Sequence, residues 1–130
     1  MLPGNQFVEQ VAEIAAEPAC VWELVSTGAG ISRWFVPAEV APGPTGWVRL
    51  TFAPGAEGVM PIQEWDPPRT IRFGSVAGGG RVHEFDVRAN QPGGTTVRVR
   101  DWGLEEEQTI GARQAWRGYL ARLILAAEGQ

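Results

Sequence analysis

The sequence predicts an α+β fold in which a curved antiparallel sheet packs against one long helix at the C-terminal end. Residues 108–130 carry the longest helical pattern, with one apolar face and a polar back. Residues 7–102 instead read mostly as short extended runs separated by Gly and Pro. Because one helix cannot bury its apolar face alone, the strands must cover it. The functional question is whether side chains or a cavity fill the space between them.

The first third of the chain predicts one strand followed by two short helices. Residues 7–15 alternate imperfectly as a strand. Pro18 suits the first turn of a helix, where a missing N–H costs nothing, and the helical spacing continues to Ser26. A second short helix is expected over residues 29–35, and Pro37 ends it. These helices would close one end of the curved sheet.

The middle of the chain predicts hairpin-linked strands. The expected strands cover residues 39–41, 47–53, 58–65, 69–76, 81–89 and 95–102. Pro61 moves its strand to an edge or bulged position, and Gly78, Gly79 and Gly80 form a hairpin tip. Alternation places Glu84 and Asp86 mostly toward water. It places a second set on the inward face: Val48, Leu50, Phe52, Ile71, Phe73, His83, Phe85, Val87, Val97 and Val99.

The closing helix carries its apolar side chains on one stripe. The members are Ala112, Trp116, Leu120, Leu123 and Ala127. Three glutamates, at positions 105–107, precede the helix and suit the positive end of its dipole.

Composition indicates one soluble domain over residues 1–130. Of the 130 residues, 44% are hydrophobic and 20% are charged, and the net charge is −4. The arginines are spread along the chain, so we expect no nucleic-acid partner. The longest apolar stretch, residues 119–127, is too short to span a membrane. A single cysteine and a start without signal-peptide features favour a cytoplasmic location.

The side chains offer little for metal or phosphate chemistry. One Cys and one His leave only carboxylates as further ligands, and consecutive glutamates cannot converge on one ion. The glycines at 78–80 lack a phosphate-binding lysine and join two strands. We therefore expect no metal and no cofactor.

Six segments in this order resemble one superfamily. They are residues 18–25 (PACVWELV), 31–35 (ISRWF), 45–50 (TGWVRL), 64–69 (EWDPPR), 94–97 (GTTV) and 116–123 (WRGYLARL). The chain resembles the SRPBCC (START/Bet v 1-like, helix-grip) superfamily and, more narrowly, its activator of Hsp90 ATPase homologue 1-like (AHSA1-like) branch. The resemblance implies a sheet of about seven strands that grips the C-terminal helix over an apolar cavity. Members include lipid and hormone carriers, polyketide cyclases and co-chaperone domains, so the fold leaves function open.

The leading hypothesis is a binding protein for a small hydrophobic or amphipathic ligand. The expected lining is Trp34, Phe52, Phe73, His83, Phe85, Val97, Trp116 and Leu120. Trp34 and Trp116 suit a pocket and a core equally well, whereas Trp22 and Trp65 are expected in the core. Ligand contact is expected along residues 112–120 of the helix, whereas residues 123–127 are expected to pack in the core without contacting the ligand.

Several alternatives stay open. A lone histidine is more often a residue at the edge of the core, hydrogen-bonded to a neighbour, than a functional acid, base or ligand anchor. We favour the first interpretation for His83. An enzyme of cyclase or hydrolase type would use His83 with Glu64 or Glu84, although alternation places Glu84 on the opposite face. A co-chaperone-like contact with an Hsp90-type ATPase is a third possibility. Trp47 is expected to be exposed beside Arg49, and Leu125, with Leu104 or Trp47, would mark a weak homodimer contact.

Overall fold

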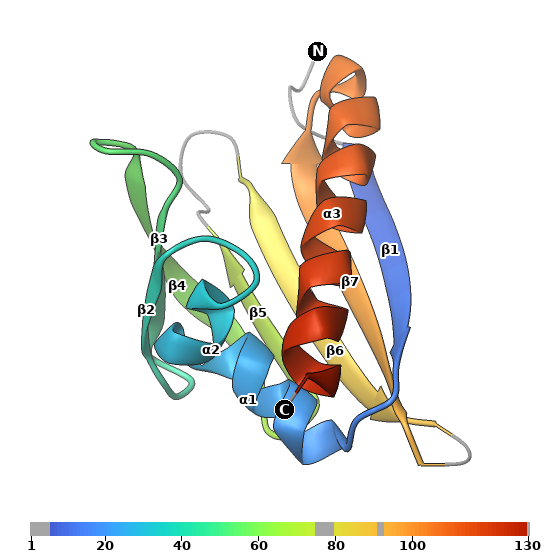
Figure 1. The fold of residues 1–130 in the computed structure, drawn as a ribbon. Coiled ribbons are helices and arrows are strands. Elements are labelled where there is room, and N and C mark those ends of the chain that lie inside the picture. Colours follow the sequence, from blue (N-terminus) through green and yellow to red (C-terminus); the bar gives the residue numbers. More distant parts are fainter. Residues whose placement is uncertain (1–5, 75–79, 91–92, 130) are drawn as a thin grey trace.

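The sheet of this protein has seven antiparallel strands in the order β1-β7-β6-β5-β4-β3-β2. The computed structural model describes residues 6–74, 80–90 and 93–129. The strands are β1 (Gln6–Ile14), β2 (Ala38–Ala41), β3 (Trp47–Thr51), β4 (Glu57–Asp66), β5 (Thr70–Gly74), β6 (Val82–Ala89) and β7 (Thr95–Leu104). The curved sheet wraps around one long helix (Figure 1), which confirms the predicted α+β helix-grip fold. The glycines predicted at the hairpin tip lie largely outside the described residues.

Two short helices close one end of the sheet. They are α1 (Pro18–Ser26) and α2 (Gly28–Ser32). Pro18 occupies the first turn of α1, as its missing N–H predicts. The second helix ends three residues earlier than predicted, so Trp34 and Phe35 lie in the turn that follows it. Gly30 allows α2 to approach α1 closely, because a Cβ there would lie 2.2 Å from the carbonyl oxygen of Glu23.

The long helix α3 (Thr109–Glu128) covers the concave face. A short 3-10 turn, η1 (Glu106–Gln108), precedes it, and Glu105 and Gln108 form a capping box there. Trp116, Leu120, Leu123 and Ala127 are buried, which confirms the apolar stripe. Figure 1 shows the C-terminal end of α3 beside α1. No helix within the described ranges combines the length and hydropathy that a bilayer crossing requires.

The strand that contains Pro61 is not an edge strand. β4 lies between β3 and β5, so the edge alternative was wrong. Its pairing with β5 is irregular between Ile62 and Glu64, which agrees with the bulged alternative.

Two carboxylates on the convex face are buried, contrary to the sequence prediction. Glu84 is 7% exposed and Asp86 is 8% exposed. They lie on β6, in the middle of the sheet, where neighbouring side chains of β5, β6 and β7 cover them. Arg72 and Arg100 pair with Glu84 at 3.4 and 3.5 Å. The Thr70 hydroxyl donates a 2.8 Å hydrogen bond to Asp86.

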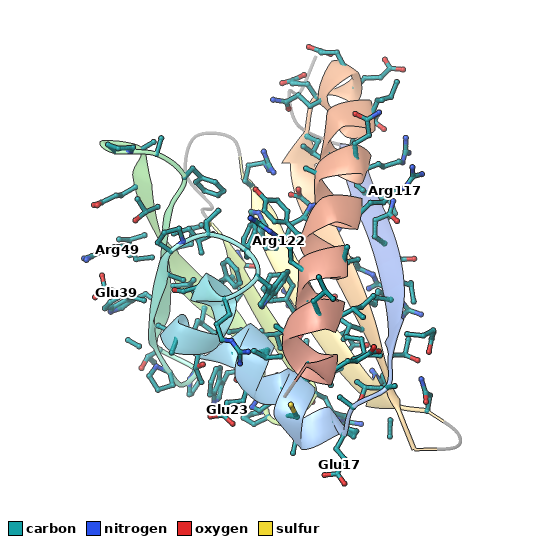
Figure 2. All side chains as sticks on the ribbon, viewed as in Figure 1. Glu17, Glu23, Glu39, Arg49, Arg117 and Arg122 are labelled. Carbon is teal, nitrogen blue, oxygen red and sulfur yellow. The ribbon has the colours of Figure 1, made fainter. Side chains whose placement is uncertain are left out.

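The structure locates three tryptophans and one leucine whose surroundings the sequence predicted. Trp22 and Trp65 are only half-buried, so they belong to the margin of the core and not to its centre. The Arg49 guanidinium lies 5.5 Å from the ring centroid of Trp47, which confirms the expected cation–π pair. Figure 2 shows Arg49 beside Glu39 at the outer edge of the sheet, and their side chains pair at 2.8 Å. Leu104 is 2% exposed and therefore cannot join Leu125 in a surface contact.

Candidate functional site

A cavity of about 170 Å³ lies between the first half of α3 and the sheet. Its lining residues are Phe35, Phe52, Arg81, His83, Asp101, Ala112, Ala115, Trp116 and Tyr119. The four α3 residues follow i, i+3, i+4, i+7 spacing, so they share one face of the helix. His83 and Asp101 come from β6 and β7, where they are directly paired across the two strands. The cavity thus joins an apolar wall to a polar floor.

Aromatic rings form most of the apolar wall. The ring of Phe35 lies 4.9 Å from that of Trp116 and 4.7 Å from that of Tyr119, between centroids. Phe52 contacts Phe35 edge-on at 6.1 Å. These separations are typical of favourable aromatic pairs. The wall therefore suits a flat apolar group.

The polar floor is built around the carboxylate of Asp101, which is only 1% exposed. The Arg81 guanidinium donates to both carboxylate oxygens, at 3.0 Å to Oδ1 and 2.9 Å to Oδ2. The Trp116 indole Nε1–H donates to Oδ2 at 2.9 Å. Burying a carboxylate is costly unless it is paired and hydrogen-bonded, and both conditions hold here.

His83 lies beside this carboxylate without a hydrogen bond to it. Its Nε2 is 3.9 Å from Asp101 Oδ1, which is too long for a hydrogen bond. Its buried Nδ1 has no hydrogen-bond partner in the described part of the chain. The interpretation of His83 as a satisfied core histidine was therefore wrong, because this nitrogen is unsatisfied. Phe73 stacks on the imidazole at 5.4 Å.

Burial sets the protonation state of His83. It lowers the pKa of the imidazole to about 4, against the attraction of Asp101 and with a smaller contribution from Arg81 in the same direction. His83 is therefore neutral at neutral pH, with one ring nitrogen that donates and one that accepts.

The predicted lining residues divide into two groups. Phe52, His83 and Trp116 line the cavity. Trp34, Phe73, Phe85, Val97 and Leu120 are buried in the core and are not part of its lining. The Trp34 indole donates to the Leu24 carbonyl at 2.7 Å, so its polar atom is already satisfied. Phe52 faces the cavity but is not buried: β3 ends at Thr51, and Phe52 lies at the cavity rim, 54% exposed.

The predicted set of lining residues omitted several cavity residues, although the expected contact range of residues 112–120 already includes Tyr119. The alternation that places Val97 and Val99 inward continues to Asp101. The helical spacing from Ala112 and Trp116 leads to Tyr119. Arg81 is in phase with His83 in the strand predicted over residues 81–89, so alternation also pointed to it. Phe35 gave no such signal, because it lies in the turn after α2.

The carboxylates proposed as partners of His83 were the wrong ones. Glu64 and Glu84 both pair with Arg72, on the opposite face of the sheet. Asp101 is the carboxylate beside the imidazole. Within the described ranges, no group of three or more His, Cys, Asp or Glu side chains could hold a metal ion.

Solved structures with the same fold come from several bacteria. Protein MLL2253 from Mesorhizobium loti superposes with a TM-score of 0.84 at 17% identity, over 96% of this chain and 98% of that one. DynU16, from the dynemicin biosynthetic locus, gives 0.82 at 18% identity, over 95% of this chain and 48% of that one. The Aha1 dimer from Colwellia psychrerythraea gives 0.73 at 18% identity, over 95% of this chain and 96% of that one. At sequence identities of 17–18%, these superpositions establish a shared fold only.

No sequence among the curated proteins matches this chain. A family model does match, over residues 6–124, and with the shared fold it confirms the resemblance to the SRPBCC superfamily. The chain belongs to the polyketide cyclase / dehydrase and lipid transport family.

Proposed function

We propose that this protein binds a small amphipathic molecule with a flat apolar body in the cavity under α3. The observation that carries the proposal is the aromatic-lined cavity itself, whose floor includes the imidazole of His83 with its unpartnered Nδ1 beside the compensated carboxylate of Asp101. An unsatisfied buried polar atom costs about 1–3 kcal/mol. The atom is closed to solvent in this conformation, so a ligand group would recover that cost by hydrogen-bonding to it as the imidazole turns toward the cavity.

The chemistry of the floor indicates what the ligand presents to it. The proton of the neutral imidazole is favoured on Nε2, the nitrogen nearer to Asp101. Nδ1 is then an acceptor, so the ligand should supply a hydroxyl or N–H donor. Arg81 and Asp101 neutralise each other at 2.9 Å, so the floor favours no net charge on the ligand.

The size of the cavity limits the ligand in this conformation. A volume of 170 Å³ suits roughly a single ring, since an apolar cavity of about 150 Å³ can hold benzene. A larger ligand would require displacement of the Phe52 side chain, about half of which is already exposed to solvent. Apolar burial supplies about 25 cal/mol per Å², before the costs of association are subtracted.

A pair of small ligands tests this proposal directly. Phenol and its methyl ether, anisole, have similar rings, but only phenol can donate a hydrogen bond. We expect phenol to shift the NMR signals of the Trp116 indole N–H and the Tyr119 backbone, and anisole to bind several-fold more weakly. Flavonoids, aromatic polyketides and lipids extend the same titration. No shift at these positions with any class of ligand would overturn the proposal.

One observation favours a second candidate, an enzyme in which His83 acts as a general base. The imidazole is neutral at neutral pH and lies in the cavity near Asp101. However, Asp101 hydrogen-bonds to Arg81 and Trp116 and does not orient the imidazole. If turnover of a bound ligand is found, His83→Ala should abolish it; unchanged turnover in that variant would dismiss this candidate.

A further inference from the structure

A second concave site lies outside the cavity, where α1 faces β2 and the end of β4. This groove has a volume of about 420 Å³, within the range of small-molecule sites. Its lining residues are Ala19, Trp22, Glu23, Ser26, Thr27, Gly28, Val40, Pro42 and Trp65. Within the described ranges it shares no lining residue with the cavity under α3. We refer to it below as the α1 groove.

Two indole rings dominate the apolar part of the α1 groove. The centroids of Trp22 and Trp65 are 5.8 Å apart, and their planes are inclined at 57°. Both side chains are only partly buried, so ring surface stays open to a ligand. Val40 and Pro42 add apolar surface beside the rings.

The polar part of the α1 groove has one free charge. The Ser26 hydroxyl donates to the Trp22 carbonyl at 2.6 Å, and the Thr27 hydroxyl donates to the Glu23 carbonyl at 2.8 Å. Glu23 is exposed, and its carboxylate has no hydrogen bond or ion pair in the part of the chain that the structure describes. The nearby Arg33 instead donates to the Ala126 carbonyl at 3.5 Å. No arginine is among the residues that line this groove.

We propose that the α1 groove binds a small organic cation with an apolar body, of the quaternary ammonium type. The faces of indole rings attract cations, and Trp is the most favourable aromatic residue for this interaction. The Glu23 carboxylate adds direct charge attraction, and the apolar residues accommodate the hydrocarbon part of the ligand. An anionic ligand would meet the carboxylate without any compensating arginine, so phosphates and carboxylic acids are disfavoured.

Benzyltrimethylammonium and its uncharged carbon isostere, neopentylbenzene, are the probes for this proposal. We expect the cation to shift the indole N–H signals of Trp22 and Trp65 saturably in ¹H–¹⁵N spectra. Trp22→Phe and Trp65→Phe assign these signals. The isostere should bind at least about fivefold more weakly, because it lacks the charge that the rings and Glu23 attract. The Trp116 signal should not move, since that residue lines the other cavity.

Two matched substitutions test the role of the carboxylate. Glu23→Gln should weaken binding of the cation by about threefold to fivefold and leave the isostere unaffected. Glu17→Gln is the control: Glu17 is also exposed and flanks α1, but it does not line the α1 groove (Figure 2). Both variants remove one exposed charge from the same region and should fold normally.

Three results would overturn the proposal. The isostere could bind as tightly as the cation, Glu23→Gln could leave the dissociation constant of the cation unchanged, or the cation could shift Trp116 in place of Trp22 and Trp65. None of these outcomes depends on ligand binding under α3, so the two proposals can fail separately.

Discussion

The indole of Trp116 and the carboxylate of Asp101 form a 2.9 Å hydrogen bond inside the cavity. This bond joins α3 to β7, the strand that lies directly before the helix in sequence. It also gives a buried tryptophan N–H and a buried carboxylate a partner each. The same two residues therefore serve the stability of the fold and the shape of the candidate site.

Replacing Trp116 with Phe should destabilise the protein by about 2 to 3 kcal/mol, because a hydrogen bond to a buried charged group is lost. Urea denaturation measures the change. Trp102→Phe is the control, since Trp102 stacks on the exposed Phe7 on the convex face, and its substitution should cost less than about 1 kcal/mol. Equal effects of the two substitutions would contradict the importance of the bond to Asp101.

Arg81 should contribute to stability mainly through Asp101. Arg81→Met leaves the buried carboxylate with only the Trp116 hydrogen bond, and we expect a loss of about 1.5 to 3 kcal/mol. The same substitution in an Asp101→Asn background should cost much less, because no buried charge remains to be compensated. A double-mutant cycle that shows additive effects would rule out this coupling.

The stability of the protein should fall in weak acid because of His83. Its pKa is about 4 in the folded state and 6.5 in the unfolded state, so the unfolded chain binds more protons between these values. The neutral imidazole is fully compatible with the fold above pH 6.5, and up to about 3 kcal/mol is lost as the pH falls to about 4. The change in unfolding free energy should be smaller in His83→Gln than in the wild type over this range. Identical pH profiles for the two proteins would contradict the buried, unprotonated state.

Phe52 and Val59 form a matched pair for testing the cavity under α3. Both are exposed, at 54% and 55%, and both belong to the β3–β4 region, but only Phe52 lines the cavity. Phe52→Ala should weaken phenol binding by about threefold to tenfold, because apolar contact is removed. Val59→Ala should leave the dissociation constant unchanged, as measured by the same NMR titration. A similar loss in both variants would place the ligand elsewhere.

Substitution of two helical glycines by alanine should change the stability of the protein in opposite directions. Gly118 lies on the exposed side of α3, with open space where the methyl group of an alanine would sit, so Gly118→Ala should stabilise the protein by about 0.5 to 1 kcal/mol. Gly30→Ala should destabilise it, because the added Cβ would overlap the Glu23 carbonyl at 2.2 Å. Thermal unfolding of both variants measures the difference, and a stable Gly30→Ala protein would contradict the close packing of α1 and α2.

The fold could be predicted because its main signals are periodic. The apolar stripe of α3 and the alternation of β6 and β7 follow directly from 3.6-residue and two-residue repeats. Alternation alone, however, does not say whether an outward side chain is covered. Glu84 points away from the core, yet it is buried because Arg72 and Arg100 on the neighbouring strands extend over it. That burial depends on strand order, which local periodicity does not contain.

The candidate site was harder to predict because it combines regular and irregular positions. The inward positions of His83 and Trp116 were predicted from periodicity, and the same alternation along β7 would have placed Asp101 inward. Phe35 reaches the cavity from a turn, where no repeat fixes the direction of a side chain. Arg81 lies just before β6 but in phase with His83, so the predicted alternation could have indicated it. Large inward aromatics such as Phe73 and Phe85 were indistinguishable from lining residues, because pockets and cores use the same residue types.

The division of α3 into two halves has a consequence for how the shape of the cavity can change. The half that begins at Leu120 holds the helix in place through Leu123 and Ala127, and the Glu128 side chain accepts a hydrogen bond from the Ala15 N–H. The other half presents two small residues, Ala112 and Ala115, to the cavity. Larger side chains at these two positions would reshape the binding space while the anchoring half stays intact. Under the proposed function, substitutions at these two positions would therefore change which ligands fit, with little cost to folding.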